Sequence, residues 1–85
     1  MTGDEWMSLQ FVPDLIYDAG KTGYEELVSK LSTTMKNLNK GHILEIISTE
    51  PGLKEKLPSW CKIETHLLLD RKDFGESSYY YIEKR

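Results

Sequence analysis

The stretch that decides the fold is residues 15–48, with the sequence LIYDAGKTGYEELVSKLSTTMKNLNKGHILEIIS. Residues 15–18 and 42–48 are mostly apolar, and glycines follow the first run and precede the second, which predicts two strands. Between them, apolar side chains recur at three- and four-residue intervals from Tyr24 to Leu38, which predicts an amphipathic helix. Because such a strand–helix–strand crossover is right-handed, we expect the two strands to be parallel neighbours.

The start of this helix carries the pattern of a capping box. Thr22 is the expected N-cap, and Glu25 is expected to reach back to it. Glu25 and Glu26 then lie at the positive end of the helix dipole. Asn39 and Gly41 are residue types that typically end a helix.

The second half of the chain adds a helix and two strands. Pro51 suits the first turn of the helix, and Pro58 predicts a kink or a restarted turn within it. Residues 64–70 and 77–84 predict strands, connected by a polar loop at residues 71–76. The expected fold class is therefore α/β: a two-layer sandwich of order β-α-β-α-β-β, with a four-stranded mixed sheet and two helices on one face.

Composition favours one small globular domain. The chain has 85 residues, of which 39% are hydrophobic and 29% charged. We expect residues 14–85 to form the domain, and residues 1–13 to be an extension that is poorly ordered or packed against a partner. No apolar run approaches the roughly 20 residues of a membrane span. The first residues include Asp4 and Glu5 but no Lys or Arg, unlike a signal peptide, so we expect a cytoplasmic protein.

Cysteine and histidine usage argues against a metal site. The single cysteine, Cys61, and the two histidines, His42 and His66, cannot assemble a Cys-rich zinc site, and both histidines are expected in strands without a second ligand. We therefore expect no metal and no cofactor. Cys61 is the one candidate nucleophile or persulfide site, but it lies on the apolar face near the end of the second helix, where the dipole disfavours a thiolate. A structural role is the favoured interpretation.

Four motifs together resemble a known family. They are Asp18-Ala19-Gly20 at the end of the first strand, the glycine-led residues 41–47, Glu50-Pro51-Gly52 followed by Leu57-Pro58-Ser59-Trp60-Cys61, and the terminal Tyr81-Ile82-Glu83-Lys84. With this spacing, residues 15–84 resemble the TusA-like (SirA-like) sulfur carriers. The resemblance implies a last strand that lies between the second and third strands and runs antiparallel to them. It also implies a small cytoplasmic carrier that receives sulfur as a persulfide from a cysteine desulfurase and passes it along a relay.

The chain departs from this family at the residue that bears the sulfur. In the family, that residue is the cysteine of a Cys-Pro-x-Pro motif at the start of the first helix. Counting residues from Asp18 to Gly41 without gaps places this motif on residues 24–27. Tyr24 stands at the position of the cysteine, and both prolines are absent. Glu25 and Glu26 would also repel a persulfide anion. We expect a non-catalytic binding or accessory module of a sulfur relay. The alternative is an active sulfur carrier that uses Cys61.

Gly20, Lys21 and Thr22 stand between a strand and a helix, as the end of a phosphate-binding loop would. The glycine that such a loop needs five positions earlier is replaced by Leu15. A local turn is the favoured interpretation, with contact to an anion or a partner as the functional alternative.

Ile43, Ile47, Tyr79 and Tyr81 are expected on the sheet face that the helices leave open. An apolar patch of this kind is typical of an interface with a protein partner or with a second copy of the chain. A weaker alternative is an RNA-binding module that uses tyrosines 79–81. The net charge of −3 disfavours nucleic acid.

Overall fold

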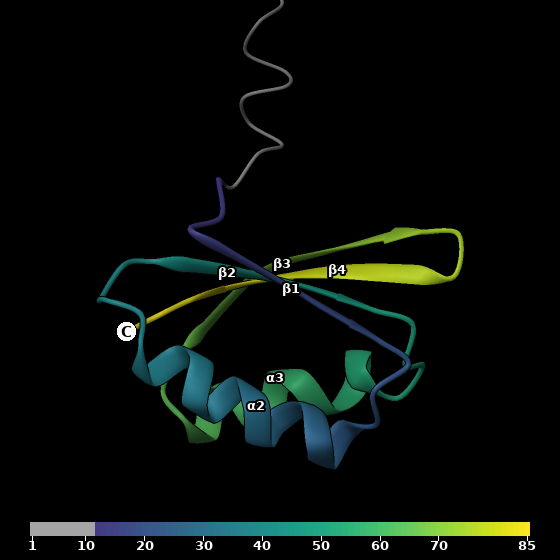
Figure 1. Cartoon of the computed structure of the whole chain (residues 1–85), viewed down its shortest axis with the longest axis horizontal. Helices are drawn as coiled ribbons and strands as arrows, with labels where there is room; N and C mark the ends of the chain where they lie inside the picture. Colours follow the sequence, from purple (N-terminus) through teal and green to yellow (C-terminus); the bar gives the residue numbers. More distant parts are fainter. Residues whose placement is uncertain (1–11) are drawn as a thin grey trace, which may run out of the picture.

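Two helices cover one face of a four-stranded sheet in the computed structural model, which describes residues 12–85 (Figure 1). The elements in chain order are β1 (Leu15–Gly20), α2 (Tyr24–Lys36), β2 (Ile43–Ser48), α3 (Leu53–Ile63), β3 (Leu67–Phe74) and β4 (Ser77–Glu83). The predicted fold class is confirmed. The extension predicted at residues 1–13 falls largely on residues 1–11, which lie outside the described part of the chain, so it stays a prediction.

The strand order across the sheet is β1-β2-β4-β3. β1 pairs with β2 in parallel, whereas β4 pairs antiparallel with both β2 and β3. The predicted parallel pairing of the first two strands and the predicted place of the last strand between the second and third are both confirmed. The carboxyl ends of β1 and β2 therefore lie at the same end of the sheet, and both helices begin at that end.

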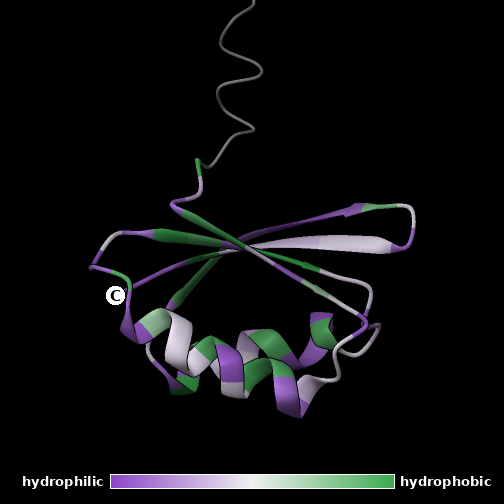
Figure 2. Cartoon of the chain, viewed as in Figure 1, coloured by the Kyte–Doolittle hydropathy of each residue, from purple (hydrophilic) through white to green (hydrophobic). Residues whose placement is uncertain are grey.

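The core lies between the sheet and the two helices, where Figure 2 shows apolar segments facing one another. Successive residues of β2 alternate between half-buried and buried, so one face of the strand points to the helices and the other does not. The buried residues of the core are Ala19, Leu27, Leu31, Met35, Leu44, Ile46, Leu53, Leu57, Trp60, Cys61, Tyr80 and Ile82. Each fully buried Leu or Ile stabilises the fold by about 1.5–3 kcal/mol relative to an exposed one.

The predicted capping box is wrong. The N-cap of α2 is Gly23, and no side chain caps the helix. Thr22 lies one residue too early, and its backbone N–H donates to the Ala19 carbonyl at 3.0 Å instead. The helix also ends earlier than expected, at Lys36, with Asn37 as its C-cap.

The structure corrects two expectations for the second half. Helix α3 continues through Pro58 to Ile63, so the turn does not restart there, and the proline ring is exposed. The alternative of a kink at Pro58 stays a prediction. The polar loop at residues 71–76 shrinks to the turn at residues 75–76, since residues 71–74 belong to β3 and pair with β4. His42 and His66 each lie directly before a strand rather than within one.

Candidate functional site

The loop between β1 and α2 is fastened to the segment that follows β2. Gly20 has a φ of +54°, a conformation that favours glycine. Its carbonyl accepts hydrogen bonds from the Thr49 backbone N–H at 2.9 Å and from Thr49 Oγ1 at 3.1 Å. The Lys21 side chain is exposed and Thr22 is half-buried. Gly20, Lys21 and Thr22 thus form an ordered turn beside the start of α2.

Tyr24 is the first residue of α2, and its side chain is half-buried against the core. The Lys56 ammonium of α3 lies 5.2 Å from the centroid of the tyrosine ring, within the range of a cation–π contact. The ring therefore links the start of α2 to α3. An aromatic side chain occupies the helix end at which a thiolate would gain most from the dipole.

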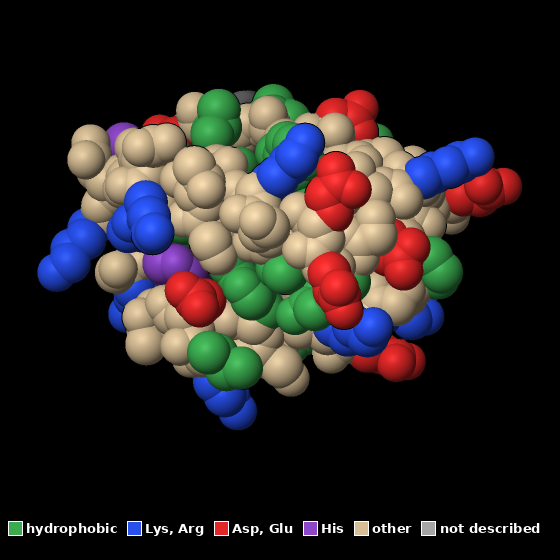
Figure 3. All heavy atoms as spheres, turned by 60° about the horizontal axis from the view of Figure 1, so that its bottom comes forward, with side chains coloured by type: hydrophobic (Ala, Val, Ile, Leu, Met, Phe, Trp, Pro, Cys, Tyr) green, Lys and Arg blue, Asp and Glu red, His purple; other side chains and the backbone are tan. Residues whose placement is uncertain are grey.

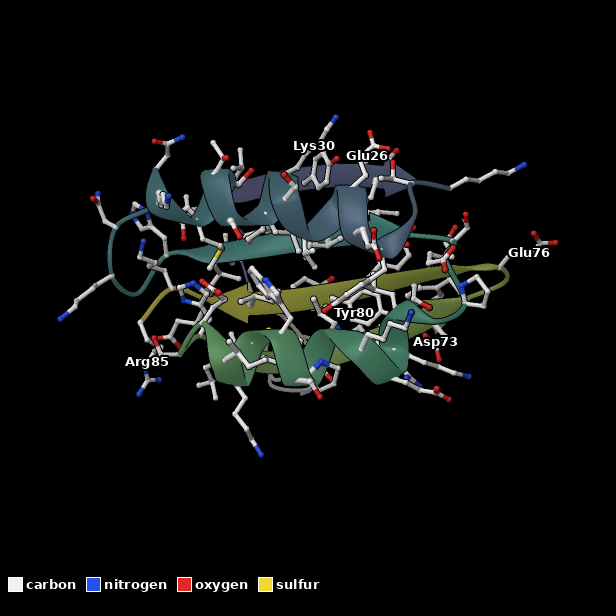
Figure 4. The ribbon with its side chains drawn as sticks, turned by 90° about the horizontal axis from the view of Figure 1, so that it is seen from below. Glu26, Lys30, Asp73, Glu76, Tyr80 and Arg85 are labelled. Atoms are coloured by element: carbon white, nitrogen blue, oxygen red, sulfur yellow. The ribbon has the colours of Figure 1, made fainter. Side chains whose placement is uncertain are left out.

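Glu25 and Glu26 occupy the rest of the first turn and are exposed. Glu26 forms an i,i+4 pair with Lys30 at 4.0 Å, on the outer side of the helix in Figure 4. Both carboxylates lie where they complement the positive end of the dipole. The same charges oppose an anion at the position of Tyr24.

Cys61 is the one cysteine of the chain, and its side chain is only 2% exposed. Burial raises the pKa of its thiol to about 11. Because α3 starts at the same end of the sheet as α2 and Cys61 lies in its last turn, Cys61 and Tyr24 stand at opposite ends of the helical layer. The structure does not bring the two candidate positions together.

A polar pocket of about 240 Å³ lies at the end of the sheet where α3 begins, against the β3–β4 hairpin. Its lining is Thr49, Glu50, Pro51, Lys54, Asp73, Gly75, Glu76, Ser78 and Tyr80, of which Figure 4 labels Asp73, Glu76 and Tyr80. Asp73 accepts hydrogen bonds from Ser78 Oγ at 2.8 Å and from Arg71 Nη2 at 3.2 Å. Burial raises the pKa of Tyr80. Sequence reasoning missed this pocket because it treated Asp73 as part of a loop.

Ile43, Ile47, Tyr79 and Tyr81 all lie on the sheet face away from the helices. The register pairs Ile47 with Tyr79, and the neighbouring buried residues of both strands point the other way. The helix-covered side carries charges of both signs around an apolar strip between α2 and α3 (Figure 3).

Within residues 12–85, no group of three or more His, Cys, Asp or Glu side chains is placed to hold a metal ion. Nor is any helix in this part of the chain long and apolar enough to cross a membrane.

Comparison with known proteins agrees with this fold. Residues 26–84, more than half of the chain, match the family described as Sulfurtransferase TusA. The "Sulfur carrier protein TusA" of Pseudomonas putida (strain W619) is 33% identical over 88% of this chain and 94% of its own length. The protein of the same name from Pseudomonas aeruginosa (strain LESB58) is 28% identical over 85% of this chain and 91% of its own length. On these grounds, the chain belongs to the TusA family.

Proposed function

We propose that this chain is a TusA-family protein that docks on a protein partner of a sulfur-transfer system in the cytoplasm without carrying sulfur itself. The observation that carries the proposal is Tyr24, the first residue of α2. A count without gaps places the family's sulfur-bearing cysteine at this residue. A phenol cannot form a persulfide, so the chemical step is lost while the fold around it is kept.

The surroundings of Tyr24 support a docking role rather than sulfur transfer. Glu25 and Glu26 place two negative charges in the first turn of α2, and a persulfide anion there would be repelled. The pocket at the same end of the sheet is lined by three further carboxylates, of Glu50, Asp73 and Glu76, against one ammonium, of Lys54. This end of the sheet is therefore suited to a neutral or cationic contact and not to an anionic sulfur.

The competing function is sulfur transport on Cys61. Two properties of this residue oppose it, the 2% exposure of the side chain and the burial that raises the pKa of its thiol to about 11. A persulfide donor needs access to the sulfur, and the attacking species is the thiolate. In the folded state, the sulfur of Cys61 is inaccessible and its thiol is protonated at neutral pH.

Sulfur loading tests the proposal directly. The chain is incubated with a cysteine desulfurase and cysteine, and the intact protein is weighed, with the Pseudomonas putida relative as the loaded control. We expect no added sulfur on this chain. A stoichiometric gain of one sulfur atom that disappears in Cys61→Ser would overturn the proposal in favour of transport on Cys61.

A further inference from the structure

The sheet presents a broad face that no described helix covers (Figure 1). We call it the open face and define it by the strand register. One row across the sheet holds Ile16, Glu45, Tyr81 and Asp70, and the next holds Asp18, Ile47, Tyr79 and Lys72. Ile43, Glu83 and Leu67 form a third row, and Phe74 lies beyond the second, with its ring 5.5 Å from that of Tyr79.

The centre of the open face is apolar and aromatic. Tyr79 and Tyr81 lie on the central strand β4, beside Ile47 on β2, and each is half-buried. Towards the two edges the apolar side chains are more exposed, with 57% of Ile16 and 64% of Phe74 accessible. Such a surface, with two tyrosines at its middle, has the composition of a protein interface.

Negative charge predominates around this apolar centre. The two rows contain three carboxylates, of Asp18, Glu45 and Asp70, against the single ammonium of Lys72. Lys72 lies 5.7 Å from the centroid of the Tyr81 ring. Burial, and then the neighbouring Glu45 carboxylate, raise the pKa of Tyr81. An occupant of this face must therefore tolerate, or neutralise, several carboxylates.

This charge distribution distinguishes between the molecules that could bind the open face. In a symmetric dimer the same patch meets itself, so one interface would hold the three carboxylates of each copy against one ammonium of each copy. RNA would bring phosphates against the same carboxylates. A protein segment with apolar side chains flanked by Lys or Arg matches both features of the open face.

We propose that the open face binds a partner protein through an apolar segment flanked by basic residues. The inference rests on the proposed docking function and names the surface and the chemistry of the partner. It places the contact on the opposite side of the sheet from α2, so that docking does not depend on the residue that stands at position 24.

The test uses the full chain, labelled with ¹⁵N, and two peptides with a Leu-Tyr-Leu centre. One peptide has two lysines at each end, and the other has two glutamates in their place. We expect the lysine peptide to shift the amide signals of β2 and β4, and to bind at least tenfold more tightly than the glutamate peptide. Tyr81→Ala should weaken binding about tenfold or more.

Charge variants keep the test independent of folding. Glu45→Gln and Asp70→Asn should each weaken the lysine peptide about threefold. Glu55→Gln, an equal change of charge at an exposed residue of α3, should leave it unchanged. Shifts confined to the helix side, or equal affinity for both peptides, would contradict the inference. So would a concentration-dependent dimer in sedimentation that Tyr81→Ala removes, since a second copy would then be the occupant.

The two proposals fail separately. Sulfur loaded on Cys61 would refute the proposed function and leave the peptide result standing. A chain that stays unloaded and binds neither peptide on the open face would refute the inference alone.

Discussion

The Lys56 ammonium lies 5.2 Å from the centroid of the Tyr24 ring. This contact joins the first residue of α2 to the first turn of α3 and holds an aromatic ring at the N-terminus of α2. A cation–π contact at a partly exposed site contributes about 0.5–1 kcal/mol. Tyr24 thus supports the packing of the helical layer, a role that a cysteine side chain would not fill.

A double-mutant cycle measures this contact. Lys56→Gln should lower the free energy of unfolding by about 0.5–1 kcal/mol in the wild type. In a Tyr24→Leu background the same change should have almost no effect, because the ring that attracts the ammonium is gone. Urea denaturation followed by circular dichroism gives the four free energies. Equal effects in both backgrounds would show that Lys56 acts elsewhere.

The thiol of Cys61 should be nearly unreactive in the folded chain. Burial raises the pKa of this thiol to about 11, which lowers the thiolate fraction at pH 8 by about two orders of magnitude. Iodoacetamide labelling of the native protein should therefore be at least about a hundredfold slower than labelling in guanidinium. The rates are read from intact mass against time. Comparable rates in the two conditions would mean that Cys61 is accessible and able to take up sulfur.

The sequence predicts the layer arrangement well because its signals are local and repeated. The three- and four-residue spacing of apolar side chains from Tyr24 to Leu38 indicates a helix with one apolar side that packs on the core. The alternation along β2 indicates a strand with one buried face and one more exposed face. Gly20 and Gly41 both have positive φ and mark the ends of the crossover. These features determine the β-α-β unit before any long-range contact is considered.

The errors arise where long-range pairing overrides local composition. Arg71, Lys72 and Asp73 resemble a loop, but they pair with Tyr80, Tyr79 and Ser78 on the central strand. An edge strand tolerates such charges because one of its sides faces water. The contact between Lys56 and Tyr24 and the pocket beside Tyr80 join segments far apart in the chain, so no local pattern indicates them.

Pro58 offers a stability prediction that follows from the continuous helix α3. Pro58→Ala restores a donor for the Lys54 carbonyl and relieves the steric cost of a proline inside a helix. The unfolded chain gains some entropy in return, so we expect a net increase of about 1–2 kcal/mol in the free energy of unfolding. Ser59→Ala, at the exposed neighbour, should change it by no more than about 0.5 kcal/mol. A destabilised Pro58→Ala protein would show that the proline is needed for the path of α3.

We expect His66 to make the stability of the fold depend on pH. Its Nδ1 is buried without a hydrogen-bond partner among the described residues, and its ring lies 5.9 Å from that of Trp60. Burial, and then the Lys84 charge, lower the pKa of His66 from its usual 6.5. The unfolded chain therefore takes up a proton near pH 6.5 that the folded chain resists. The free energy of unfolding should fall as pH decreases through 6.5, until the folded-state pKa is passed.

Urea denaturation between pH 7.5 and pH 5.5 checks this sign. His66→Gln should flatten the pH dependence, whereas His42→Gln, at the other histidine, should retain it. If the wild type and His66→Gln lose stability in parallel, another group is responsible.

The last prediction concerns a thiol placed at the start of α2. Tyr24→Cys, in a Cys61→Ser background, places one reporting thiol at the helix N-terminus. The dipole and the Lys56 ammonium lower its pKa, whereas the carboxylates of Glu25 and Glu26 raise it. Each carboxylate is a full charge within one helical turn, although solvent screens both. We expect the opposing effects nearly to cancel, leaving the pKa of the thiol near its ordinary value of about 8.5.

The rate of iodoacetamide labelling against pH reports this pKa. Adding Glu25→Gln and Glu26→Gln should lower it and speed labelling at neutral pH, because the dipole and Lys56 then act unopposed. Adding Lys56→Gln to the single variant should raise it instead, which separates the ammonium from the dipole. A strongly lowered pKa in Tyr24→Cys alone would mean that the carboxylates do not block the site. Under the proposed function, the tyrosine at position 24 alone would then account for the absence of sulfur transfer at this helix end.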